Sequence, residues 1–157
     1  MYINAGAKVT IDGVGTLDAD CGIYVLGTLI INNGVINATG DGIFAGIGGS
    51  DFVLVEINGG NVTAIGGNQA STYDGGGAGI GGTNSASITG KIKINGGIIY
   101  AKGGVGAAGI GGGGFYTYND CAPATNAPNI YISELANVTA INGGYDAEDI
   151  GNGGYGC

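Results

Sequence analysis

Two short phrases alternate along this chain, and their alternation constrains the fold more than any other feature. One phrase, Gly-Ile-Gly-Gly, occupies residues 46–49, 79–82 and 109–112, with a degenerate copy, Asp-Ile-Gly-Asn, at 149–152. The other phrase is Ile-Asn followed by Asn-Gly or Gly-Gly, and it occupies residues 31–34, 57–60 and 94–97. Each copy of the second phrase precedes a copy of the first. A unit that recurs in fixed order predicts a solenoid of stacked coils.

The composition favours strands and excludes several other classes of protein. Glycine supplies 38 of the 157 residues, yet 44% are apolar, so the chain is neither a linker nor disordered. The aliphatic residues are mostly β-branched, which favours strands over helices. The net charge is −8 and only four residues are basic. We therefore expect no nucleic-acid partner and, because no long apolar run is present, no insertion into a membrane.

Aligning the two phrases predicts an all-β fold, a parallel β-helix of about five coils with Gly/Asn-rich corners and inserted loops. The coils would occupy residues 3–27, 28–51, 52–90, 91–128 and 129–157 of a single domain, 1–157. One inward column of side chains would be Ile11, Ile31, Ile57, Ile94 and Ile132. A second column would be Leu17, Ile36, Val62, Ile99 and Val138. Asn32, Asn58 and Asn95 would share one corner, where stacked amides can bond along the axis.

Long loops interrupt the later coils. The spacings between successive members of the first inward column are 20, 26, 37 and 38 residues. A constant core with growing spacing indicates insertions at corners, where functional loops are commonly found. These insertions, at residues 66–77 and 113–128, hold four aromatic residues that we take as candidate binding residues: Tyr73, Phe115, Tyr116 and Tyr118. Such aromatics either stack on sugar rings or cover the solenoid and join subunits.

The sequence contains few of the residue types that commonly act in catalysis. The chain has no histidine and no arginine, which excludes catalytic triads, arginine clamps and histidine metal sites. The glycine-rich phrases do not open helices, so they do not predict a nucleotide-binding loop. Their structural interpretation is a face without side chains, which another backbone, a second solenoid or a flat sugar chain could approach. We expect a protein that is not an enzyme.

Acidic residues form two small groups that are candidate calcium ligands. Asp18, Asp20 and Asp41 make up the first group, and Asp146, Glu148 and Asp149 make up the second. Carboxylates combined with backbone carbonyls at a coil corner suit calcium. The alternative is that both groups are solvated acidic corners.

The three cysteines, Cys21, Cys121 and Cys157, do not have the spacing of metal ligands. They are either incidental thiols or disulfide partners, which would require an oxidising compartment. In the second case we expect Cys157 of one subunit to bridge Cys21 of the next, with Cys121 free or paired internally.

Three segments carry a family resemblance. Residues 57–64 (Ile-Asn-Gly-Gly-x-Val-x-Ala) and 77–82 (Gly-Ala-Gly-Ile-Gly-Gly) resemble repeats of large secreted surface proteins of clostridia and related bacteria. Residues 38–43 (Ala-Thr-Gly-Asp-Gly-Ile) resemble the clostridial carbohydrate-binding β-helix domain family. That resemblance implies an extracellular or cell-surface location, with plant-type polysaccharide and calcium as ligands.

Two functions follow from this sequence. The first is a non-enzymatic structural or adhesive solenoid of a bacterial surface, either assembling head to tail with itself into a fibre or presenting a binding face. Coil one begins almost at residue 1 and coil five reaches residue 157, and open strand edges at the ends of a solenoid favour such pairing. The second is a calcium-assisted carbohydrate-binding module of a cell-surface protein.

Overall fold

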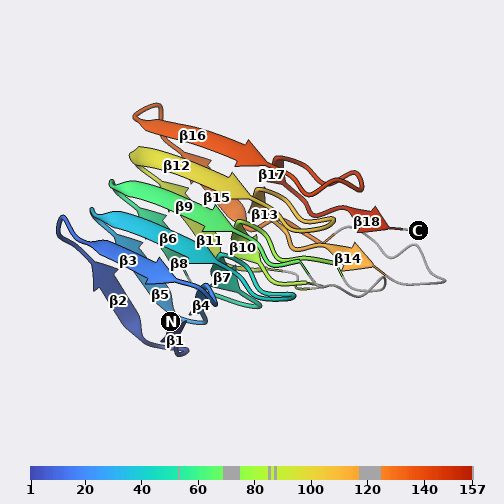
Figure 1. The fold of residues 1–157 in the computed structure, drawn as a ribbon, viewed down its shortest axis with the longest axis horizontal. Coiled ribbons are helices and arrows are strands. Elements are labelled where there is room, and N and C mark those ends of the chain that lie inside the picture. The colour runs from blue at the N-terminus through green and yellow to red at the C-terminus, as the bar shows by residue number, and fades with distance from the viewer. Residues whose placement is uncertain (53, 69–74, 85, 87, 117–124, 157) are drawn as a thin grey trace.

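The computed structural model is an all-β parallel β-helix, and it describes residues 1–52, 54–68, 75–84, 86, 88–116 and 125–156. Three parallel sheets run the length of the solenoid, and the coils rise in tiers from the N-terminal to the C-terminal end (Figure 1). No helix occurs in the described ranges, and none of them offers a helical segment able to cross a membrane.

Each coil contributes one strand to each sheet. Sheet I contains β2 (Lys8–Ile11), β5 (Thr28–Ile31), β8 (Leu54–Ile57), β11 (Lys91–Ile94) and β15 (Asn129–Ile132). Sheet II contains β3 (Thr16–Ala19), β6 (Val35–Thr39), β9 (Asn61–Ile65), β12 (Gly97–Lys102) and β16 (Ala136–Ile141). Sheet III contains β1 (Tyr2–Ile3), β4 (Ile23–Val25), β7 (Ile47–Gly49), β10 (Ile80–Gly82), β13 (Ile110–Gly111) and β17 (Ile150–Gly151). A separate pair, β14 (Phe115–Tyr116) and β18 (Tyr155–Gly156), lies to the side of the solenoid (Figure 1).

Alternating side chains explain how the sheets form a core. In β11, Lys91 and Lys93 are exposed whereas Ile92 and Ile94 are completely buried, as expected for a strand with one face inward. Both predicted inward columns are confirmed, because their members pair directly from coil to coil. The core is therefore a stack of identical layers of Ile, Val, Leu and Ala.

The corner between sheets I and II holds the predicted asparagine ladder. Asn58 Nδ2 donates to Asn32 Oδ1 at 2.9 Å, and Asn95 Nδ2 donates to Asn58 Oδ1 at 2.8 Å. Two residues after each asparagine, a glycine turns the chain with a positive φ, as at Gly60 (φ 89°). The Ile-Asn phrase is thus the signature of this corner.

The Gly-Ile-Gly-Gly phrase builds sheet III, and here one sequence-based interpretation is wrong. The isoleucine points into the core, but the glycine after it is also buried, so no bare face is left for an outside partner. Gly81 has a φ of 141°, and a Cβ on it would overlap the carbonyl oxygen of Gly111 in the next coil. The backbone that the glycines admit is the chain's own neighbouring coil.

Glycine also packs the loops next to sheet III. Gly76 N donates to Val105 O at 2.6 Å, Gly104 N to Gly77 O at 2.8 Å, and Gly114 N to Gly76 O at 2.8 Å. These glycines are buried, and a Cβ on Gly104 would overlap the carbonyl oxygen of Gly67. The described parts of the inserted loops therefore stack as layers of bare backbone held by hydrogen bonds.

The two end coils differ from the middle ones. Ile31, Ile57 and Ile94 have no exposed surface, whereas Ile11 and Ile132, at the ends of the same column, are half-buried. Sheet III also has six strands while sheets I and II have five, because β1 lies below coil one and pairs with β4. The N-terminal end of the solenoid is thus covered at sheet III and open at sheets I and II.

Candidate functional site: an aromatic cleft at the first coil

Two of the four aromatic residues predicted as binding residues, Phe115 and Tyr116, lie within the described structure. Tyr73 and Tyr118 lie outside the described residues. The Phe115 side chain is half-buried on β14, opposite Tyr155 in the register of β18. Only the backbone of Tyr116 is described, also on β14. The binding role predicted for these four residues stays a prediction.

The acidic residues of the first two coils occupy separate positions and do not form a shared site among the described residues. Asp18 is on the outer face of sheet II, where its Oδ1 accepts a hydrogen bond from Asn37 Nδ2 at 2.7 Å. Asp20 is exposed in the turn after β3, and Asp41 is exposed in the turn after β6. Among the residues that the structure describes, no three His, Cys, Asp or Glu side chains lie close enough to hold a metal ion.

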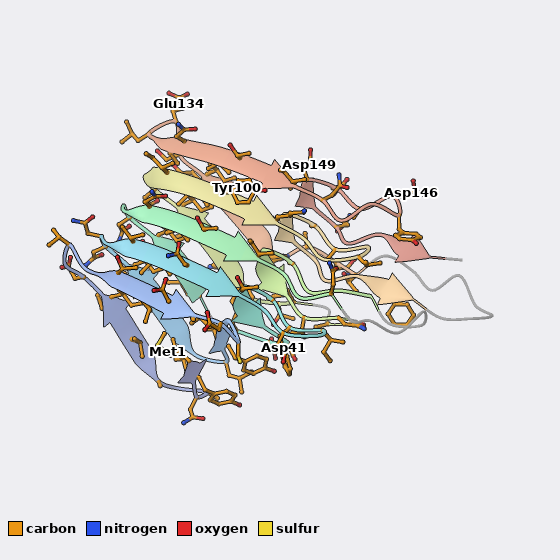
Figure 2. The ribbon with its side chains drawn as sticks, viewed as in Figure 1. Met1, Asp41, Tyr100, Glu134, Asp146 and Asp149 are labelled. Atoms are coloured by element: carbon orange, nitrogen blue, oxygen red, sulfur yellow. The ribbon has the colours of Figure 1, made fainter. Side chains whose placement is uncertain are left out.

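The acidic residues of coil five serve its turn. Glu148 Oε2 accepts a hydrogen bond from Asn152 N at 2.7 Å, and Asp149 Oδ1 accepts from both Asn142 N at 2.9 Å and Asn142 Nδ2 at 2.8 Å. Asp146 is exposed at a positive φ of 58°. Figure 2 shows Asp146 and Asp149 near the top of the picture, at the last coil, and Asp41 near the bottom, at the first coils. These contacts hold backbone amides rather than converge on a shared centre.

A cleft of about 640 Å³ opens beside the first coil and is the candidate site considered below. Its walls come from β1, β4 and the turns before β4 and β7; they are Met1, Tyr2, Cys21, Tyr24, Asp41, Phe44 and Ala45. Met1 and Asp41 lie at the same edge of the molecule (Figure 2). A cleft of this size with mostly apolar walls, three aromatic rings and few polar groups is typical of small-ligand sites.

Three rings form the apolar wall. Tyr2 and Tyr24 are stacked, with centroids 5.1 Å apart and planes at 16°. Phe44 meets Tyr24 edge to face, with centroids 5.6 Å apart and planes at 86°. The exposed fractions are 59% for Tyr2 and 43% for Phe44, so ring surface remains free to bind. Exposed aromatic surface of this kind offers an apolar face together with a polar hydroxyl.

The register of sheet III explains why these rings gather. Tyr2 pairs with Tyr24 on one side, but on the other side Tyr24 pairs with Gly48, which has no side chain. Phe44 takes that position from a tight turn in which its N donates to Asp41 O at 3.0 Å. The turn needs Gly42, whose φ is 54°. Phe44 and Asp41 are therefore placed at the cleft by the same turn.

Polar groups line or support the cleft on two sides. The Met1 ammonium donates to Gly22 O at 2.9 Å, which fixes β1 beneath coil one. The Tyr24 hydroxyl bonds Ser50 Oγ at 2.9 Å, and Ser50 Oγ bonds Thr83 Oγ1 at 3.3 Å. The Asp41 carboxylate is exposed at the rim. An amphipathic ring could thus stack on the tyrosines and donate hydroxyl hydrogens to a carboxylate.

Sequence reasoning missed Tyr2, Tyr24 and Phe44 because it sought aromatics only in the long loops. A signal was present at residues 22–24, where Gly-Ile-Tyr stands at the level of Gly-Ile-Gly in later coils. Among the described strands of sheet III, the column that contains Tyr2 and Tyr24 continues as Gly48, Gly81, Gly111 and Gly151, so only β1 and β4 carry a side chain there.

Cys21 also lines the cleft, is exposed and is a free thiol. Cys121 and Cys157 lie outside the described residues. The bridge between Cys157 and Cys21 of adjacent subunits therefore stays a prediction.

Comparison with known proteins supports the fold. Residues 29–51 and 92–114 match the model of a family described as a β-helix repeat. These two segments coincide with β5–β7 and with β11–β13, one coil each. No curated protein and no solved structure matches the chain. The architecture and the matched segments together define this chain as a protein of parallel β-helix repeats.

Proposed function

We propose that this chain is a non-enzymatic binding module of a bacterial surface that holds a sugar ring of an extracellular polysaccharide in the cleft beside coil one. One observation carries the proposal: Tyr2, Tyr24 and Phe44 present ring surface in a cleft whose rim holds Asp41. Sugar rings have apolar faces and donor hydroxyls, so they complement stacked rings with a carboxylate beside them.

The absence of histidine and arginine supports a binding role over a catalytic one. The four lysines are the only basic side chains, and none of them lines the cleft. Asp41 is the one carboxylate among the residues that line the cleft, so the cleft lacks the pair of carboxylates that glycoside hydrolysis commonly uses.

Calcium is not part of the mechanism we propose. Asp41 would accept hydroxyl hydrogens directly, whereas Asp18, Glu148 and Asp149 accept hydrogen bonds from amides elsewhere. We expect the same affinity for the sugar in calcium and in a chelator. A strict requirement for calcium would instead favour the carbohydrate-binding mode implied by the family resemblance.

A glycan array followed by calorimetry on the best ligand tests the proposal. Tyr2→Ala, Phe44→Ala and Asp41→Asn should each weaken binding about tenfold or more, which corresponds to loss of a stacking or charge-assisted contact. Tyr131→Ala is a matched control, because Tyr131 has the same 59% exposed fraction as Tyr2 but lies on sheet I of coil five. Equal affinity of all four variants would contradict the cleft as the binding site.

End-on association with further copies of the chain is a second function, favoured by the open end coils. Ile11 and Val9 at one end, and Ile130 and Ile132 at the other, are only half-buried, and each of the two strands that carry them has one edge without a partner among the described strands. Natural sheets normally protect such edges against pairing. Size-exclusion chromatography with negative-stain electron microscopy tests this function: filaments support it, and a monomer at all concentrations contradicts it.

A further inference from the structure

We propose that β1 is a displaceable plug, and that the edge of β4 which it covers accepts β17 of a second copy when two solenoids stack end on. This inference rests on the proposed end-on association and names the surface and the partner strand. The strand counts carry it: sheet III has six strands and sheets I and II have five.

When two copies stack end on, β17 of one copy and β1 of the next would need the same position beside β4. If β15 and β16 of one copy continued sheets I and II below β2 and β3 of the next, β17 of the first copy would fall beside β4 of the second. That place is occupied by β1, whose Tyr2 and Ile3 pair with Tyr24 and Val25. Three sheets can therefore continue across the junction only if β1 leaves.

The rest of the junction is complementary in the register that the internal coils use. Continuing the columns places Ile132 against Ile11, and Val138 against Leu17. All four side chains are half-buried at the free ends and would become buried. On the outer faces of sheets I and II, Asn129 would oppose Lys8 and Thr139 would oppose Asp18, so no like charges oppose each other at these two positions.

The asparagine corner also matches across the junction. Asp12 follows Ile11 and Ser133 follows Ile132, so each extends the corner column of Asn32, Asn58 and Asn95 by one level. Ser133 of one copy would then face Asp12 of the next, a hydroxyl donor opposite a carboxylate acceptor. The amide ladder would continue through the junction as a charge-assisted bond.

β1 is held by few contacts compared with what the junction offers. Tyr24 N donates to Met1 O and Leu26 N donates to Ile3 O, both at 2.8 Å, and the Met1 ammonium bonds Gly22 O. The strand has only two residues, with Ile3 as its one buried side chain. The junction would pair two four-residue strands, β2 and β3, that are unpaired on this side.

Displacement of β1 has a consequence for the cleft, because Met1 and Tyr2 form part of its wall. A copy whose N-terminal end is stacked would lose the Tyr2–Tyr24 stack. Within a filament, only the copy at the free N-terminal end would keep the complete sugar site. Sugar binding and end-on stacking should therefore compete.

Removal of β1 tests the inference. A chain lacking residues 1–4 should form filaments at a protein concentration at least tenfold lower than the full chain, as seen by light scattering and electron microscopy. Ile3→Asp is the second variant, because a carboxylate cannot occupy the buried position and should expel β1 without shortening the chain. Circular dichroism of both variants verifies that the sheets are retained.

A charge pair at the corner verifies the register. In the chain lacking residues 1–4, Ser133→Asp would place two carboxylates together and should abolish filaments, whereas adding Asp12→Lys should restore them. If the full chain and the chain lacking residues 1–4 form filaments at the same protein concentration, β1 is not a plug. End-on association would still stand. Absence of association in every variant would overturn both, and neither result decides whether the full chain binds sugar, which the glycan array tests separately.

Discussion

Asn58 is the middle rung of a ladder with Asn95: it accepts from Asn95 Nδ2 at 2.8 Å while its own amide donates to Asn32 at 2.9 Å. Asn58→Ala removes both bonds and should lower the free energy of unfolding by about 1–3 kcal/mol, since each bond contributes about 0.5–1.5 kcal/mol. Urea denaturation followed by circular dichroism measures the change. Asn33→Ala is the control, because Asn33 is exposed at the same corner and lies outside the ladder; an equal loss in both variants would refute the ladder's contribution.

Gly81 should tolerate no side chain. Gly81→Ala adds a Cβ that overlaps Gly111 O at a φ of 141°, and strain plus overpacking should cost about 2–6 kcal/mol. Gly15→Ala is the matched control, since a Cβ there meets nothing within 4 Å. Thermal unfolding should separate the two variants by many degrees, and equal midpoints would contradict the close stacking of coils at sheet III.

The inward column should lose more stability when it is cut in the middle than at its end. Ile57→Ala empties a fully buried position and should cost about 2–5 kcal/mol, whereas Ile11→Ala at a half-buried position should cost less than about 2 kcal/mol. Chemical denaturation of both variants gives the comparison. The result would be reversed if coil one, rather than the middle of the solenoid, held the most cooperative packing.

The exposed Cys21 thiol should report on both the cleft and the predicted bridge. In a Cys121→Ser, Cys157→Ser variant, alkylation of Cys21 should slow when sugar occupies the cleft, because the thiol lines it. Mass spectrometry over time measures the rate. An unchanged rate at saturating sugar would place the ligand elsewhere.

The bridge itself needs a separate experiment. Under oxidising conditions, the wild-type chain should give reducible dimers and higher oligomers on a gel. Both Cys21→Ser and Cys157→Ser should remove them, and Cys121→Ser should not. Dimers that survive the loss of Cys21 would exclude it as a partner.

Much of the fold could be predicted from the sequence because one physical rule repeats in every coil. Parallel stacking places equivalent residues at equal levels, so the recurrence of Ile31, Ile57 and Ile94 gave the register directly. The asparagine ladder followed from the same logic. The strand β1 was not predicted because no repeat phrase marks Tyr2 and Ile3.

The candidate site was less predictable, and the reason is local. Phe44 approaches Tyr24 because of a turn at Asp41 and Gly42, and neither repeat phrase encodes that turn. The acidic residues illustrate the same limit. Asp149 Oδ1 and Glu148 Oε2 each accept a hydrogen bond from a nearby backbone amide, a local role that the sequence did not predict, and their role as calcium ligands stays a prediction. Short-range hydrogen bonding of this kind has no signature in spacing alone.

The row of hydroxyls from Tyr24 through Ser50 to Thr83 has a consequence for what the cleft can accept. In both bonds of that row either oxygen is able to act as donor, so the hydrogens can all point toward the cleft or all point away from it. Rotation of three hydroxyls converts one polarity into the other without moving a heavy atom. The Tyr24 hydroxyl can therefore present a lone pair to one ligand and a hydrogen to another. At this hydroxyl, the cleft would select a ligand by the shape of the ligand's ring rather than by a fixed pattern of hydrogen-bond donors.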